Sequence, residues 1–152
     1  MKKSNNVGHS IKLSKETIDN LKIGIVVSRF NNDITEEMSS LCLDRLFEIG
    51  IKQTNIEIIN VPGSFEIPVV ISKNIKKYDG FVALGSIIKG ETPHFDFISQ
   101  SVTDSIMQLS INSKKPIGNG IITTLNKKQA KIRSLTKGKE AAQAVLSVLD
   151  NF

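Results

Sequence analysis

Short apolar runs alternate along this chain with stretches in which apolar residues recur every three to four positions. Four runs are continuous and rich in β-branched residues, at residues 23–27, 56–61, 81–84 and 116–123, and the third extends towards residue 88. Such runs are typical of strands that are buried on both faces. Each run is followed by a stretch of helical periodicity, and this alternation predicts a parallel sheet with helices on both faces.

Two helices are expected after the first two strands. Apolar residues between positions 38 and 49 share one helical face, and Gly50 ends that helix. A second apolar stripe covers residues 67–75. Ser64 is its expected N-cap, and Pro68 lies in the first turn, where a backbone N–H is not needed.

The second half of the chain repeats the pattern. Thr92 is the expected cap of a helix whose apolar face covers residues 95–109. After the fourth strand, Asn126 caps a short helix, a break is expected at residues 135–138, and a final helix covers residues 141–149. The chain is therefore expected to end in one extra helix.

These elements predict one domain of the α/β class, which fits a length of 152 residues. The expected architecture is a three-layer α/β/α sandwich around a four-stranded parallel sheet, flavodoxin-like in topology, over residues 21–152. Residues 1–20 are polar and weakly patterned, so an N-terminal arm is expected there, either flexible or docked on a neighbouring molecule.

The composition narrows the range of functions. The formal net charge is +5, but the lysines are scattered and the few aromatic residues (5%) are not interleaved with them, so nucleic-acid binding is not favoured. No apolar run approaches a membrane span, and polar residues follow Met1 where a signal peptide needs an apolar stretch. The single cysteine, Cys42, excludes an internal disulfide and fits a reducing compartment. A cytoplasmic protein without a metal-ligand cluster is expected.

Polar, glycine-containing segments come directly after the strands, at residues 28–33, 62–66, 85–94 and 124–127. Ligands of parallel α/β sheets bind beyond the carboxyl ends of the strands. These segments are therefore expected to converge on one edge of the sheet and to form a site there. No Gly-x-x-x-x-Gly-Lys-Ser/Thr or Gly-x-Gly-x-x-Gly motif follows the first strand, so a nucleoside triphosphate or a dinucleotide is not indicated.

Two features of the third segment suggest chemistry. His94 would lie in the first turn of its helix, where the helix dipole disfavours imidazolium, and a neutral imidazole suits proton transfer. A surface or capping histidine is the structural alternative. The cationic segment 89–92 leads to the same helix N-terminus, which either binds a phosphate or is simply capped. His9, in the polar arm, is not expected to take part.

Four further side chains have two interpretations each. Phe30 either stacks on a flat heterocycle or covers the edge of the sheet. Glu66 either contacts a ligand or stabilises a helix N-terminus. Arg133 and Lys137 either pair with a phosphate or stabilise a helix C-terminus.

Taken together, four segments of the chain resemble the 6,7-dimethyl-8-ribityllumazine synthase family, which catalyses the penultimate step of riboflavin biosynthesis. The resemblance covers roughly residues 22–150. Its motifs are Ser28-Arg29-Phe30-Asn31, Val61 to Pro68, Leu84 to Asp96, and Gly118 to Thr124 with Gln129-Ala130. The run Gly-Glu-Thr-Pro-His-Phe-Asp at residues 90–96 is specific to the family.

The resemblance implies condensation of 5-amino-6-(D-ribitylamino)uracil with 3,4-dihydroxy-2-butanone 4-phosphate, without a metal or an organic cofactor. It implies that His94 is the proton shuttle and that Phe30 stacks on the pyrimidine. The remaining substrate-binding residues that it implies are Ser64, Phe65 and Glu66 for the ribityl-aminouracil, Ser86, Ile87 and Ile88 for the uracil edge, Glu91, Thr92 and Arg133 for the phosphate, and Asn119 and Lys137.

The chain departs from the family pattern at two places. Asn119 stands where many members have an aromatic residue that reaches across a subunit interface, so it would hydrogen-bond instead of stacking. The segment from Arg133 to Lys137 is shorter than the usual spacing. The family builds homopentamers with sites between neighbouring subunits, and some members assemble further into decamers or capsids. The polar arm and the altered segment favour a free pentamer here.

Two other functions stay open. A non-catalytic protein that binds lumazine or flavin on the same scaffold would keep the cavity and lose turnover, although the presence of His94 and Arg133 argues against it. A receiver-type signalling domain shares the topology. It needs an acidic cluster after the first strand, where this chain has Ser28-Arg29-Phe30.

Overall fold

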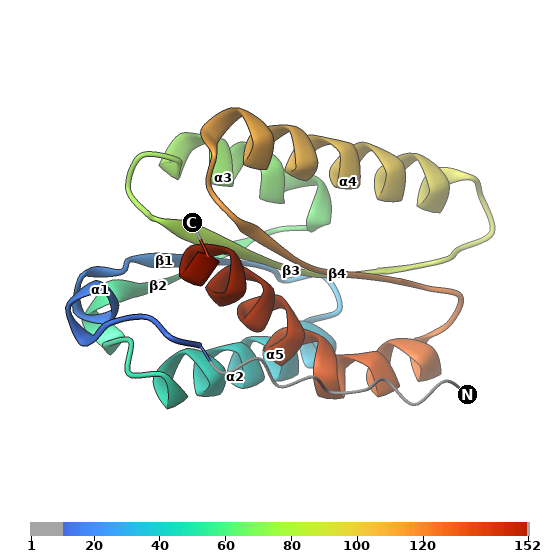
Figure 1. Ribbon diagram of the computed structural model, residues 1–152. Coiled ribbons are helices and arrows are strands. Elements are labelled where there is room, and N and C mark those ends of the chain that lie inside the picture. Colours follow the sequence, from blue (N-terminus) through green and yellow to red (C-terminus); the bar gives the residue numbers. More distant parts are fainter. Residues whose placement is uncertain (1–10, 152) are drawn as a thin grey trace.

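The chain folds into a parallel four-stranded sheet between two layers of helices (Figure 1). The computed structural model describes residues 11–151. The strands are β1 (Ile23–Ser28), β2 (Ile56–Val61), β3 (Gly80–Ile88) and β4 (Ile117–Thr124), in the order β2-β1-β3-β4. All three pairings are parallel, so the predicted α/β/α sandwich and its four strands are confirmed.

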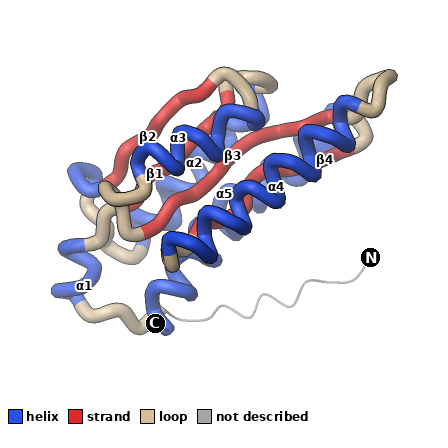
Figure 2. Tube along the Cα trace, turned by 90° about the horizontal axis from the view of Figure 1, so that it is seen from above, coloured by secondary structure: helices blue, strands red, loops and turns tan. Residues whose placement is uncertain are grey.

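Helices cover both faces of the sheet. α3 (Ile67–Asn74) and α4 (His94–Ser113) lie on one face, and Figure 2 shows them over the strands from above. α2 (Asn32–Glu48) and α5 (Lys127–Asn151) lie on the other face. The shorter elements are α1 (Lys15–Asn20) and the 3-10 turns η1 (Gln53–Asn55) and η2 (Ser64–Glu66). Within residues 11–151, no helix has the length and apolar character needed to cross a membrane.

The central strands β1 and β3 contribute side chains to two separate cores. Val26 and Ala83 belong to the core under α3 and α4, whereas their neighbours Ile25, Val27 and Leu84 belong to the core over α2 and α5. Successive side chains of a strand point to opposite faces of the sheet. Burial on both faces therefore explains why these strands are continuous apolar runs in the sequence.

The C-terminal part of the chain differs from the prediction. The break expected at residues 135–138 is absent, because α5 is a single helix over its whole length. Gly138 does not interrupt α5; it is a packing position, since a Cβ atom added to it would lie 2.0 Å from the carbonyl oxygen of Met38 in α2. Glycine lets the two helix backbones approach closely, and this contact outweighs its low helix propensity. Val148, predicted to face the core, is 45% exposed.

The predicted helix caps are confirmed only in part. The Asn126 side-chain oxygen accepts a hydrogen bond from the backbone N–H of Gln129 (2.9 Å), as expected of an N-cap. Ser64 does not cap α3, because it opens the 3-10 turn η2 instead. Thr92 is not the N-cap of α4, which begins at His94; the Thr92 hydroxyl accepts only a long bond of 3.4 Å from the His94 N–H.

Residues 11–20 pack against the rest of this chain. The Ser14 hydroxyl caps α1 by accepting a hydrogen bond from the N–H of Thr17. Ile11, Leu13 and Ile18 are partly buried against the core over α2 and α5. The polar composition of the segment gave no sign of α1. The rest of the expected arm, with His9, lies outside the described residues.

Candidate functional site

A cavity lies at the carboxyl ends of β1, β2 and β3. Its volume is about 450 Å³, which is typical of sites for small molecules. The residues that line it are Phe30, Gly63, Ser64, Phe65, Glu66, Ser86, Ile87, Ile88, Gly90, Thr92, His94, Phe95 and Ile98. Three of the four post-strand segments thus converge as predicted, whereas residues 124–127 do not reach this cavity.

Two hydrogen bonds connect the loops around the cavity. The backbone N–H of Phe30, after β1, donates to the carbonyl of Pro62, after β2 (3.0 Å). The side-chain amide of Asn31 donates to the carbonyl of Ser86 on β3 (3.1 Å). The loop after β1 is therefore attached to the loop after β2 through backbone groups and to β3 through the Asn31 side chain, although Phe30 and Phe65 on these loops are exposed.

Small residues allow the loop after β2 to lie close to β3. A Cβ atom added to Gly85 would lie 2.4 Å from the Ser64 hydroxyl and 3.4 Å from the Ser28 hydroxyl, so only glycine fits there. Ser28 and Ser86 are almost fully buried, and their hydroxyls have no hydrogen-bond partner within residues 11–151. Of these residues, Ser64 and Ser86 line the cavity, so the close packing of the loop on β3 brings polar groups to its wall.

Two aromatic side chains border the cavity and remain exposed. Phe30 is 71% exposed and Phe65 is 62% exposed. A flat ligand that covered these rings would remove apolar surface from water. Glu66, between Phe65 and α3, is half-buried and supplies a carboxylate to the same cavity.

His94 is the first residue of α4, and its exposed side chain lines the cavity. The free N–H groups and the partial positive charge of the helix N-terminus lie beside it. The predicted position of His94 in the first turn is confirmed. Of the adjacent residues, Thr92 lines the cavity, whereas Glu91 is exposed and does not.

The apolar wall of the cavity was not recognised from the sequence. Phe95 and Ile98 lie on the face of α4 that the periodicity assigned to the core, and both are half-buried. They line the cavity as well. The available signal was their place one and four residues after His94, because residues of the first turns of a helix at a ligand site share its environment.

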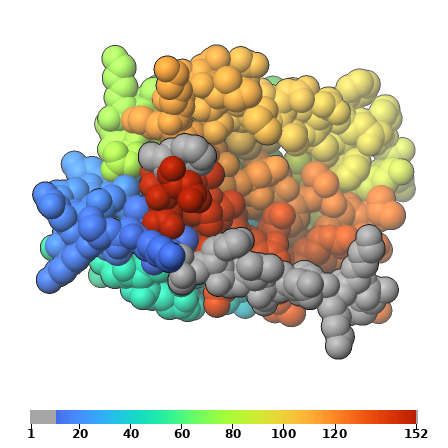
Figure 3. Space-filling view, viewed as in Figure 1, coloured from blue at the N-terminus to red at the C-terminus, as the bar shows by residue number. Residues whose placement is uncertain are grey.

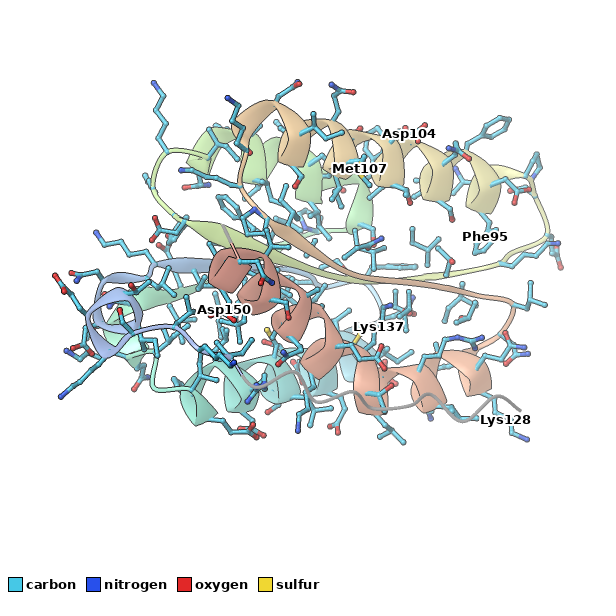
Figure 4. The ribbon with its side chains drawn as sticks, in the orientation of Figure 1. Phe95, Asp104, Met107, Lys128, Lys137 and Asp150 are labelled. Atoms are coloured by element: carbon cyan, nitrogen blue, oxygen red, sulfur yellow. The ribbon has the colours of Figure 1, made fainter. Side chains whose placement is uncertain are left out.

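Arg133, Lys137 and Asn119 do not join this cavity in the single chain. Arg133 and Lys137 line a separate cavity of about 280 Å³ between α5 and β4, together with Thr123. Figure 4 shows Phe95 on α4 above the sheet and Lys137 on α5 below it. The space-filling view likewise shows α4 and α5 in different layers (Figure 3). Asn119 is exposed on β4, and its side-chain oxygen accepts a hydrogen bond from the N–H of Ile121 (3.1 Å).

One ion pair joins α2 and α5 near their N-termini. The Lys127 ammonium lies 3.0 Å from the Asp33 carboxylate. The hydrogen bond from Lys127 holds the pKa of Asp33 below its ordinary value, with a smaller contribution from the charges of Lys127 and Lys131. The pair is exposed to solvent and is not part of the cavity lining.

The fold and the cavity together define a class, the flavodoxin-like α/β proteins that bind a small ligand beyond the carboxyl ends of parallel strands. Comparison with known proteins narrows this class. The family model for 6,7-dimethyl-8-ribityllumazine synthase matches residues 20–152. The 6,7-dimethyl-8-ribityllumazine synthase of Polynucleobacter necessarius subsp. necessarius is 41% identical over 130 residues, which cover 84% of this chain and 76% of that protein. The protein of the same name from Methylobacillus flagellatus is 37% identical over 144 residues, which cover 91% and 97%.

The chain therefore belongs to the 6,7-dimethyl-8-ribityllumazine synthase family, and the resemblance carried by its four motifs is confirmed. It is a transferase of riboflavin biosynthesis. The flavodoxin-like sheet agrees with this assignment.

Proposed function

We propose that the chain condenses 5-amino-6-(D-ribitylamino)uracil with 3,4-dihydroxy-2-butanone 4-phosphate to form 6,7-dimethyl-8-ribityllumazine, phosphate and water. The observation that carries the proposal is a single cavity lined by Phe30, Glu66 and His94, which come from three different segments that follow strands. A condensation of two substrates needs a stacking surface, polar anchoring groups and a proton carrier in one place.

The pyrimidine substrate suits the part of the cavity between the ends of β1 and β3. Phe30 stacks on the heterocycle, and its exposed ring supports this role. The backbone from Ser86 to Ile88 offers hydrogen bonds to the uracil edge. Ser64 and Phe65 hold the ribityl-aminouracil together with Glu66, whose carboxylate accepts hydrogen bonds from the ribityl hydroxyls.

The phosphate substrate suits the N-terminus of α4. Glu91 and Thr92 lead into this end of the helix, where unpaired N–H groups and the helix dipole favour an anion. The two cations proposed to bind phosphate, Arg133 and Lys137, line a different cavity of the same chain. They are therefore assigned to the active site of a neighbouring subunit, and so is Asn119 on the edge strand β4. The separation of the two cavities supports active sites that lie between subunits. The resemblance to the family is the ground for proposing that the assembly is a homopentamer and that it is cytoplasmic.

His94 carries protons between the two substrates. When the amine of the pyrimidine adds to the ketone, a carbon–nitrogen bond forms, the nitrogen loses a proton and the carbonyl oxygen gains one. The imidazole accepts this proton and returns it to the oxygen, which becomes a hydroxyl. It then takes the second proton of the same nitrogen and passes it to the hydroxyl, so that water leaves and a carbon–nitrogen double bond remains. Loss of phosphate and ring closure follow. Both steps need the reacting groups of the two substrates to be held in a fixed relative orientation.

Mixing the two substrates with the purified protein tests the proposal. Formation of 6,7-dimethyl-8-ribityllumazine, followed by its absorbance and fluorescence, is expected at a rate well above that of the protein-free mixture. Omission of either substrate is the control. A protein that binds the lumazine but forms none of it would be the non-catalytic binder, and the proposed activity would be rejected.

A further inference from the structure

Asn31 has an unusual backbone conformation. Its φ and ψ angles are 58° and 47°, in the left-handed region, which among residues 11–151 only one other non-glycine residue, Lys114, also enters. Asparagine tolerates this region better than most residues do. Asn31 is also the N-cap residue of α2, a position where an asparagine side chain usually accepts a hydrogen bond from the helix. Here the side chain makes no such bond.

The Asn31 amide is directed to β3 instead. It donates a hydrogen bond of 3.1 Å to the carbonyl of Ser86, fifty-five positions further along the chain. The residue pairs that join β1 and β3 end at Val27 and Leu84, whereas β3 continues to Ile88. The amide thus supplies a bond to β3 beyond the point where β1 stops pairing with it.

The neighbouring residue Phe30 depends on the backbone for its position. Its ring is 71% exposed, so packing of the side chain fixes it little. The backbone is held on one side by β2, because the N–H groups of Arg29 and Phe30 donate to the carbonyls of Val61 and Pro62. On the β3 side, it is held by the bond from the Asn31 amide to Ser86.

We propose that Asn31 is a positioning residue that sets the distance between the Phe30 ring and the backbone of β3 from Ser86 to Ile88. In the proposed function, the Phe30 ring covers the face of the heterocycle and this backbone meets its edge, so the inference rests on that function. A flat ring must touch the aromatic face and meet the backbone hydrogen-bonding groups at once. Asn31 does not itself touch the substrate; it acts through the Ser86 carbonyl.

Two variants test this role. Asn31→Gly keeps the left-handed backbone, because glycine adopts it readily, but removes the amide. Asn31→Asp keeps the shape of the side chain and removes the donor. We expect each variant to raise the KM of the pyrimidine substrate and the Kd of 6,7-dimethyl-8-ribityllumazine by about tenfold, the effect of losing one good hydrogen bond. The KM of the phosphate substrate should stay within about twofold of the unmodified value.

Lys114→Gly is the matched control. Lys114 is the only other described non-glycine residue with a left-handed backbone, and it lies at the end of α4, away from the cavity. It should leave both KM values unchanged. Variants of Asn31 that bind pyrimidine and lumazine as well as the unmodified protein would overturn the inference. An equal rise in both KM values with a fall in Tm would overturn it too, since that is a general structural effect. If the unmodified protein forms no lumazine, the proposed function fails, and the Kd measurements alone still decide on Asn31.

Discussion

Among the described residues that line the cavity, His94 is the only histidine, the residue type that proteins use most often for proton transfer, and its share of catalysis can be measured separately. Much of the rate should come from holding two substrates together, which His94→Ala does not remove. We therefore expect this variant to lower kcat by roughly 10²-fold, the low end for a proton-transfer group, and not to abolish turnover. Steady-state kinetics with the unmodified protein as reference would measure this. A folded variant that binds substrate but forms no detectable lumazine would contradict the expectation.

Cys42 illustrates how burial alone controls reactivity. The thiol lies in the core on α2, and desolvation raises its pKa from 9.0 to about 12. Because the thiolate is the reactive form, almost none is present at pH 8 in the folded protein. A thiol reagent such as 5,5′-dithiobis(2-nitrobenzoate) should react at pH 8 only after the protein is unfolded in guanidinium, with one thiol per chain. Rapid reaction of the native protein would show that the core opens easily.

At the scale of elements, the contact between α2 and α5 decides the effect of changing Gly138. Helix propensity alone favours Gly138→Ala by about 1 kcal/mol. The added Cβ atom would, however, lie 2.0 Å from the Met38 carbonyl oxygen, so the helices would have to move apart. We expect a net loss of about 1–3 kcal/mol in the free energy of unfolding, measured by urea denaturation. Gly90→Ala is the control, since a Cβ there meets nothing within 4 Å and should change stability little.

At the scale of the whole molecule, the division of the site between subunits can be tested by complementation. His94→Ala and Arg133→Ala each damage one side of the proposed shared site. If unfolded chains of both variants are mixed in equal amounts and refolded, about one quarter of the sites should combine an intact His94 with an intact Arg133 from the neighbour. Activity should then rise to about a quarter of the unmodified value. A mixture no more active than the mean of its parents would place both residues in one subunit.

The order of strands and helices could be predicted because each element leaves a local pattern of apolar residues in the sequence. A strand buried on both faces is apolar along most of its length, as β1 is from Ile23 to Val27, and a helix beside a sheet repeats its apolar residues every three to four positions. The place of the site followed from the same pattern. In a parallel sheet all loops after strands lie at one edge, so Phe30, Glu66 and His94 had to approach one another.

The periodicity could not predict which residues, far apart in the sequence, contact each other in the folded chain. Read locally, Gly138 predicts a break in the helix. Only the close approach of Met38 in α2 explains why a glycine lies inside the continuous helix α5. Asparagine is a common residue at helix N-caps. Only the tertiary structure shows that the Asn31 amide donates a hydrogen bond to the Ser86 carbonyl near the end of β3. Arg133 and His94 are residue types that suit one site, yet α5 and α4 place them in different cavities. Local sequence determined the elements and the edge where the site lies; contacts between residues far apart in the chain, which no local pattern encodes, decided which groups meet there.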